Sequence, residues 1–137
     1  MTIFSKIAAG EIPAHKVAES TDFLAFLDIN PLTEGHLLVI PKKEVDYLFD
    51  LDDTTYTGLQ LFAKIVAKGL KRAIPCVRIG VVVMGLEVPH AHIHLIPMNG
   101  PNDINFTNPK LSFSPEQFEI TMNKIKEGLR QEYNSEN

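Results

Sequence analysis

Short apolar blocks, several of them alternating with polar residues, mark the first third of the chain and the stretch between residues 77 and 97. They predict five strands, at residues 15–19, 22–28, 36–41, 77–84 and 88–97. The block HLLVIP at 36–41 is almost entirely apolar, which suits a strand in the middle of a sheet. Gly85 lies near the turn between the last two strands, which could pair as a hairpin.

Two longer segments show helical spacing of apolar residues. In the first, Asp52 or Asp53 is placed to cap the helix, and Pro75 lies just beyond its end. The second begins at Ser114-Pro115-Glu116-Gln117, where serine caps, proline starts the helix and glutamine completes a capping box. This helix is expected to run to about Glu132, and the polar tail YNSEN to fray.

The remaining segments complete the expected architecture. A short helix is predicted at about residues 3–9, closed by Gly10, and the Asn- and Pro-rich segment 98–113 is predicted to be a loop. Five strands and two main helices without βαβ alternation predict an α+β fold with a mostly antiparallel five-stranded sheet. The 137 residues, 45% of them hydrophobic and 22% charged, fit one domain with a real core.

Charge and cysteine content narrow the classes of function. The net charge is −4 and no basic tract is present, which argues against general nucleic-acid binding. The single cysteine, Cys76, excludes an internal disulfide and fits a reducing compartment. The N-terminus has no signal-peptide pattern, and no segment approaches the ~18 apolar residues of a membrane span. The expectation is a cytoplasmic protein that does not enter a membrane.

Three of the five histidines stand at alternate positions in the stretch VPHAHIHLIP, residues 88–97. On a strand, His90, His92 and His94 share one face, and the apolar residues between and after them share the other. From His90 to His94 a strand rises roughly 13 Å, at about 3.3 Å per residue, so three imidazoles on a straight strand do not easily meet at one point. Their alignment favours a chemical role.

Two kinds of chemistry fit such a row. In a metal site, His-x-His offers two ring nitrogens to one zinc ion, with further ligands from His36, His94 or Glu87. In covalent catalysis, one ring nitrogen donates to a carbonyl or carboxylate, which leaves the lone pair of the other aimed at phosphorus. Flanking imidazoles then bind the phosphoryl oxygens, and the middle histidine attacks.

His-x-His-x-His followed by two apolar residues resembles the signature of the histidine triad (HIT) superfamily of nucleotide hydrolases and transferases. The blocks IFSKIAAGEIPAHKVAE, FLAFLDINPLTEGHLLVIPKK and VPHAHIHLIP resemble the family blocks in order and spacing, over roughly residues 3–97. The last forty residues match loosely. The resemblance implies a single HIT domain over residues 1–137, with a five-stranded antiparallel sheet. It also implies a homodimer and a nucleoside monophosphate ligand, often AMP or GMP.

The resemblance also assigns roles to residues. His92 matches the nucleophile that takes the nucleotidyl group, His94 and His36 match residues that contact the α-phosphate, and His90 helps to order the site. Asp28 matches an acid that hydrogen-bonds the ribose hydroxyls. The residues that match the apolar walls around the base are Ile12, Phe26, Leu27 and Ile29.

Each assignment has a structural alternative. Asp28 could start a turn before Asn30-Pro31, and His36 could be a packed, hydrogen-bonded strand residue. Phe26 and Ile29 could belong to the core. His15 is expected at the surface, and Lys42-Lys43 at a solvated strand end.

The sequence departs from the family in two places. Some members hold a structural zinc through Cys-x-x-Cys and a later histidine, but those positions are Thr2, Ser5 and Glu44 here, so this zinc is not expected. Many members have Gly-Gln-Ser/Thr before the triad. Here Gly85 fits the glycine, whereas Leu86 and Glu87 replace the other two.

The resemblance therefore implies a hydrolase that releases AMP or GMP from a phosphoramidate or related leaving group, through a nucleotidyl-His92 intermediate. It is expected to need no cofactor and no catalytic metal. A carboxylate at Glu87 is expected to favour cationic amine leaving groups over polyphosphates. The alternatives are a nucleotide-binding module with little turnover, a dinucleoside polyphosphate hydrolase and a strand-based metal protein.

Overall fold

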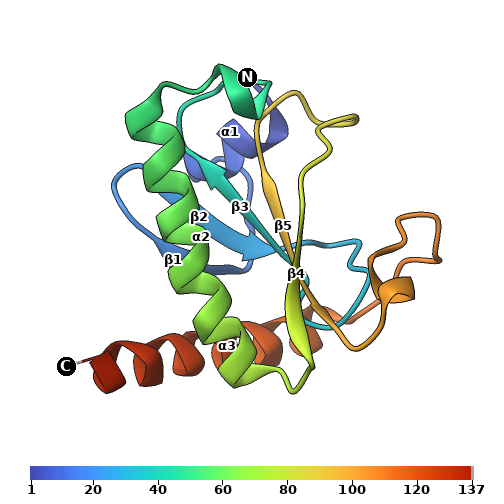
Figure 1. The fold of residues 1–137 in the computed structure, drawn as a ribbon. Coiled ribbons are helices and arrows are strands. Elements are labelled where there is room, and N and C mark those ends of the chain that lie inside the picture. The colour runs from blue at the N-terminus through green and yellow to red at the C-terminus, as the bar shows by residue number, and fades with distance from the viewer. Residues whose placement is uncertain (137) are drawn as a thin grey trace.

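The computed structural model describes residues 1–136 as a five-stranded antiparallel sheet with helices on both faces (Figure 1). This confirms the predicted α+β fold with two main helices. The strands are β1 (Lys16–Glu19), β2 (Phe23–Leu27), β3 (Leu37–Pro41), β4 (Arg78–Val82) and β5 (Ile93–Met98), in the spatial order β1-β2-β3-β5-β4. The helices are α1 (Ile3–Ala8), α2 (Asp53–Ala73) and α3 (Pro115–Glu136), with short 3₁₀ turns η1 (Leu48–Asp50) and η2 (Pro101–Ile104).

Alternation along the central strands creates two apolar cores. In β2, Ala25 and Leu27 pack toward α2 and α3, whereas Leu24 and Phe26 pack toward α1 on the other face. Because both faces are covered, β3 is buried along its whole length, as its apolar run predicted. The apolar residues of the histidine segment, Ala91, Ile93 and Leu95, lie in the α2/α3 core as expected, so the histidines lie on the α1 side.

The last strand is shorter than the sequence predicted. β4 and β5 pair as the expected antiparallel hairpin, and Gly85 has the positive φ of 70° that a connecting turn requires. However, β5 begins at Ile93, so His90 and His92 precede the strand. Residues 86–90 bend, and the backbone N–H of Ala91 bonds to the carbonyl of Val45 rather than to the sheet ladder. The three histidines therefore do not lie on one straight strand.

Local capping signals were read correctly, but the end of the last helix was not. The Asp52 side chain caps α2 at Thr55, and Ser114 and Gln117 form the predicted capping box of α3. The backbone of α3 continues to Glu136 instead of fraying after Glu132, and an ion pair with Arg72 of α2 holds its last turns. The last residue of the tail, Asn137, is outside the described residues. No helix within residues 1–136 is long and apolar enough to cross a membrane.

α2 and α3 approach closely where each carries a glycine. A Cβ on Gly128 would lie 2.3 Å from the carbonyl oxygen of Gly69, and a Cβ on Gly69 would lie 2.5 Å from the Leu129 side chain. We therefore expect Gly128→Ala to destabilise the protein by about 2 kcal/mol despite the better helix propensity of alanine, because the helices must separate. Urea unfolding measures this loss.

Gly100→Ala is the matched control, because a Cβ at Gly100 has no atom within 4 Å. Its free energy of unfolding is expected to stay within about 0.5 kcal/mol of the wild-type value. Equal effects of the two substitutions would contradict the close helix crossing.

Candidate active site

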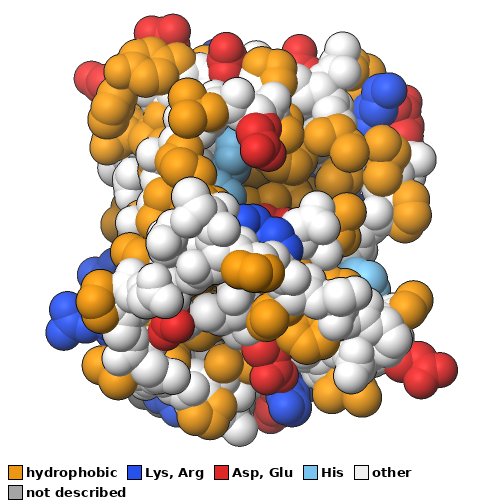
Figure 2. All heavy atoms as spheres, turned by 90° about the vertical axis from the view of Figure 1, so that its right-hand side faces the viewer, with side chains coloured by type: hydrophobic (Ala, Val, Ile, Leu, Met, Phe, Trp, Pro, Cys, Tyr) orange, Lys and Arg blue, Asp and Glu red, His pale blue; other side chains and the backbone are white. Residues whose placement is uncertain are grey.

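Adjacent strands bring three polar side chains to one place. Asp28 follows β2, His36 precedes β3 and His94 lies on β5, and these three strands are neighbours in the sheet. Asp28 Oδ2 lies 3.6 Å from His36 Nε2, and His36 Nε2 lies 2.9 Å from His94 Nδ1. His92 is next in the row, with its ring centroid 5.0 Å from that of His94. In Figure 2, histidine side chains are visible in a hollow rimmed by hydrophobic side chains.

A hydrogen bond from the backbone determines the tautomer of His36, and a hydrogen bond from His36 determines that of His94. The N–H of Leu32 donates to His36 Nδ1 at 3.0 Å, so the proton of neutral His36 is on Nε2. That Nε2–H donates to His94 Nδ1, which places the proton of His94 on Nε2. His94 is thereby prepared as a hydrogen-bond donor at the end of its ring that is not occupied by His36.

The other two histidines donate to backbone carbonyls, and only His92 carries its proton on Nδ1. His90 Nε2–H donates to the carbonyl of Pro41 at 2.8 Å, and His92 Nδ1–H donates to the carbonyl of His90 at 2.7 Å. With its proton on Nδ1, neutral His92 keeps the lone pair on Nε2. A fixed Nδ1–H and a lone pair on the opposite nitrogen are what a nucleophilic imidazole requires.

Burial keeps the supporting histidines neutral. It lowers the pKa of His36 to about 3 and that of His94 to about 4, and it lowers the pKa of His90 as well. Burial also raises the pKa of the Asp28 carboxyl, while the Asn30 N–H, which donates to Asp28 Oδ1 at 2.8 Å, opposes that rise. Asp28 therefore does stabilise the turn before Asn30-Pro31, but only through Oδ1, and its Oδ2 lies on the side of His36.

The residues expected to form the base walls do not all face this site. Phe26 is buried in the core on the histidine side, with Ile12 packed against that core, and Ile29 is 66% exposed. The structure does not bring Leu27 to them, because its side chain lies in the α2/α3 core on the other face of the sheet. Strand alternation forces this separation, since Phe26 and Leu27 are consecutive.

A second part of the site lies toward β4. A hollow of about 600 Å³ opens beside His92 and is lined by Tyr47, Phe49, Tyr56, Met84 and Leu86, among others. The exposed Glu87 follows these residues in the same loop, and its charge contributes to the raised pKa of Asp28. This loop, residues 83–92, therefore combines apolar surface with a carboxylate next to the histidines.

Several site neighbours were missed by sequence reasoning. Phe106, in the segment predicted as plain loop, packs edge-on against His94 with ring centroids 4.9 Å apart, and it also contacts His36. Lys110 lies over Phe106 and contributes to the lowered pKa of His36. Phe4 of α1 packs edge-on against His92 at 5.1 Å. A lone phenylalanine in an Asn- and Pro-rich stretch gives no signal of such contacts.

The residues predicted to lie outside the site are not part of it. His15, expected at the surface, is instead half-buried, because its ring stacks on Phe118 of α3. Lys42 and Lys43 form ion pairs with Glu19 and Asp52, respectively.

The hydrogen bonds oppose the metal alternative. Within residues 1–136, Asp28, His36 and His94 are the group whose ligand atoms lie close enough for one cation, within 4.8 Å of one another. To bind a metal through Nε2, His36 would have to move its proton to Nδ1 and lose the bond from Leu32. His90 and His92 do not form a metal pair either, because both nitrogens of His90 and Nδ1 of His92 already have partners.

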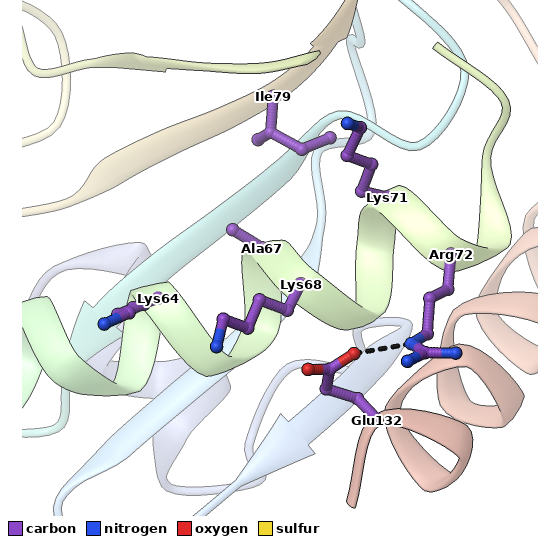
Figure 3. Close-up of a pocket in the computed structure, with 7 residues that line it drawn as sticks. All are labelled: Lys64, Ala67, Lys68, Lys71, Arg72, Ile79 and Glu132. Carbon is purple, nitrogen blue, oxygen red and sulfur yellow. Dashed lines mark hydrogen bonds and ion pairs between the residues drawn. The ribbon is translucent and has the colours of Figure 1, made fainter. Parts of the chain in front are cut away.

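Another hollow, of about 540 Å³, lies between α2, α3 and β4, away from the histidines (Figure 3). Lysines of α2 surround it, and the Arg72–Glu132 ion pair closes one end. Its lining residues include no histidine, cysteine or serine, so the candidate active site is the histidine site.

The sheet order, and the three histidines of residues 90–94 together with His36 just before β3, define a histidine triad protein. The chain belongs to the HIT domain family, whose model matches residues 9–100. An uncharacterised HIT-like protein from Borreliella burgdorferi is 38% identical over 129 residues, which cover 88% of this chain and 93% of that protein. An adenosine 5′-monophosphoramidase from Schizosaccharomyces pombe is 32% identical over 93% of this chain and 98% of its own length.

A solved structure agrees with the fold. The crystal structure of a HIT-like protein from Bartonella henselae superposes with a TM-score of 0.82 at 32% identity, and the match covers 93% of this chain and 95% of that one. The family match ends at residue 100, so Phe106 and Lys110 lie outside it.

Proposed function

We propose that this protein is a hydrolase that releases a purine nucleoside monophosphate, AMP or GMP, from a phosphoramidate, through a covalent intermediate on His92. The observation that carries the proposal is the tautomer of His92, whose Nδ1–H is held by the His90 carbonyl and whose Nε2 lone pair remains for attack. The adenosine 5′-monophosphoramidase among its relatives supports the substrate class.

The reaction follows from the four imidazoles. His92 Nε2 attacks phosphorus and forms a phosphorus–nitrogen bond, while the bond to the leaving amine breaks and the amine departs with a proton taken from solvent. Water then attacks the phosphorus, returns one proton to solvent, breaks the phosphorus–nitrogen bond and so releases the monophosphate and neutral His92. His94, with its proton on Nε2, donates to a phosphoryl oxygen, and His36 keeps it in that tautomer. The carbonyl of His90 accepts Nδ1–H of His92 and so orients the His92 ring.

The nucleoside is proposed to lie toward β2 and the leaving group toward β4. Asp28 Oδ2 binds the ribose hydroxyls, and Phe26, Ile12 and Ile29 contact the base. The hollow beside His92, which Gly85 and Leu86 line and after which Glu87 follows in the chain, then receives the amine.

A homodimer is proposed through β4. This strand is at the edge of the sheet, and Val77, Val81 and Val83, at or next to it, are between 42% and 63% exposed. An exposed apolar edge strand favours pairing with a second chain.

The function is tested by mixing the protein with adenosine 5′-phosphoramidate and following AMP release. The same reaction, stopped without acid, is digested to locate the adduct by mass spectrometry. AMP release with a nucleotidyl group on the peptide containing His92 supports the proposal. AMP binding without release or adduct would support a nucleotide-binding module instead, and an adduct elsewhere would refute the assigned nucleophile.

Glu87 is expected to influence the choice of leaving group. Its carboxylate attracts a cationic amine and repels a polyphosphate, so Glu87→Ser should lower the preference for a lysine-like phosphoramidate over diadenosine tetraphosphate by about fivefold. The preference is the ratio of the two kcat/KM values. Asp22→Ser, which removes the same charge at the opposite end of β2 from Asp28, should leave the ratio unchanged. An unaltered ratio in Glu87→Ser would show that Glu87 does not determine which leaving group is preferred.

A further inference from the structure

A polar cluster holds the first histidine of the triad from outside the reaction site. Thr2 and Ser5 at the start of α1, and Glu44 after β3, surround His90. Thr2 Oγ1 lies 2.9 Å from His90 Nδ1, and Ser5 Oγ lies 3.3 Å from the same nitrogen. Glu44 Oε1 accepts from the Thr2 backbone N–H at 2.6 Å and from Ser5 Oγ at 2.7 Å. The cluster joins three segments that are far apart in the sequence.

The positions of the protons follow from these distances. His90 Nε2–H donates to the Pro41 carbonyl, so His90 Nδ1 must accept. The Ser5 hydroxyl gives its only proton to the Glu44 carboxylate. The Thr2 hydroxyl, which accepts from the Ser5 backbone N–H at 3.0 Å, is then the donor to His90. This arrangement gives every group a partner and uses the two shortest side-chain contacts, whereas the contacts of Ser5 Oγ with Thr2 Oγ1 and with His90 Nδ1 are both longer, at 3.3 Å.

The cluster can influence the position of the His92 ring through two contacts. The His90 carbonyl accepts Nδ1–H of His92, so the position of His90 determines the position of that acceptor. Phe4 of α1 packs edge-on against the rings of both His90 and His92, with centroids 5.9 and 5.1 Å away. α1 has six residues, too few to be stable alone, so its contacts with the rest of the protein hold it in place.

We propose that Thr2 is a positioning residue for the nucleophile. Its hydroxyl holds the His90 ring, and His90 in turn holds Nδ1–H of His92 and so keeps the lone pair on Nε2. The N-terminal helix thus takes part in the reaction without touching the substrate. The inference rests on the proposed role of His92, but the tautomer of His92 can be measured without substrate.

Thr2→Val tests the proposal, because valine keeps the shape of threonine and removes the hydroxyl. We expect kcat for adenosine phosphoramidate to fall about tenfold, the effect of one hydrogen bond, with KM changed less than twofold. The ¹⁵N chemical shifts of the nucleotide-free protein should show His92 with a single protonated Nδ1 in the wild type and a mixture of tautomers in Thr2→Val.

Three variants separate positioning from simple support of the fold. Thr2→Ser keeps the hydroxyl and should restore kcat and the single tautomer. Ser5→Ala removes the proton given to Glu44 but not the donor to His90, so it should affect the tautomer less than Thr2→Val. Thr54→Val, which removes an exposed threonine hydroxyl from the start of α2, should change neither.

The outcomes are distinguishable. If Thr2→Val lowers the melting temperature while kcat and the His92 tautomer stay as in the wild type, the cluster only supports α1 and the proposal is refuted. If the wild-type protein releases no AMP, the proposed function fails. A tautomer shift in Thr2→Val would even then show that Thr2 positions His92.

Discussion

Replacing His92 with glycine is expected to lower kcat/KM for adenosine phosphoramidate by at least about 10⁴-fold, as loss of a covalent nucleophile does in other hydrolases. The remaining imidazoles do not replace it. His36 and His94 have their Nδ1 lone pairs occupied by Leu32 N–H and by His36 Nε2–H, and their other nitrogens carry protons. Stopped-flow or discontinuous AMP assays measure the loss.

Chemical rescue provides the control for this substitution. Glycine leaves a space beside His94 and Phe4, and added imidazole is expected to restore part of the activity by attacking from that space. AMP affinity, measured by calorimetry, should change less than about threefold, because the contacts proposed for ribose and base do not involve His92. Activity of His92→Gly near the wild-type level would refute the covalent mechanism.

Sequence reasoning succeeded where a structural feature depends on local pattern. Period-two alternation placed Ala91, Ile93 and Leu95 in the core and the histidines on the other face, and this holds although the strand starts late. The capping signals at Asp52 and Ser114 depend on side chains within three residues, so they too could be predicted.

Sequence reasoning failed where distant segments meet. Thr2 contacts His90 across 88 positions and Phe106 contacts His36 across 70, and no local pattern encodes either contact. In the sequence, Thr2, Ser5 and Glu44 stand out only as positions that lack zinc ligands, yet in the structure they form a hydrogen-bonded cluster around His90. For Leu27 the family position and strand alternation point to different places, because alternation puts its side chain in the α2/α3 core on the other face of β2 from Phe26.

The fold is expected to lose about 4 kcal/mol of stability when the pH falls from 8 to 5, about 2 kcal/mol from each of His36 and His94. Their pKa values in the folded protein, about 3 and about 4, lie below the ordinary value of 6.5. At pH 5 both are mostly protonated in the unfolded chain and neutral in the folded protein, so the unfolded state binds more protons and stability falls with pH. The loss begins near pH 6.5 and continues toward pH 3. Asp28, whose pKa is raised, has the opposite sign and reduces the total.

Urea unfolding at several pH values measures this dependence, and His36→Asn isolates its source. The asparagine side-chain oxygen can still accept from the Leu32 N–H but cannot be protonated, so the stability difference between pH 8 and pH 5 should shrink by about half.

An unchanged difference would mean that His36 is protonated in the folded protein at pH 5. Protonated His36 could still donate through Nε2, so the tautomer of His94 would stay fixed as long as the His36 ring did not move. Its Nδ1 would carry a proton, however, so the Leu32 N–H would lose its acceptor, and the loop that carries Asp28 toward the site would loosen. A flat pH profile would therefore argue against neutral imidazoles as the basis of the site, whereas a steep one that His36→Asn halves supports it.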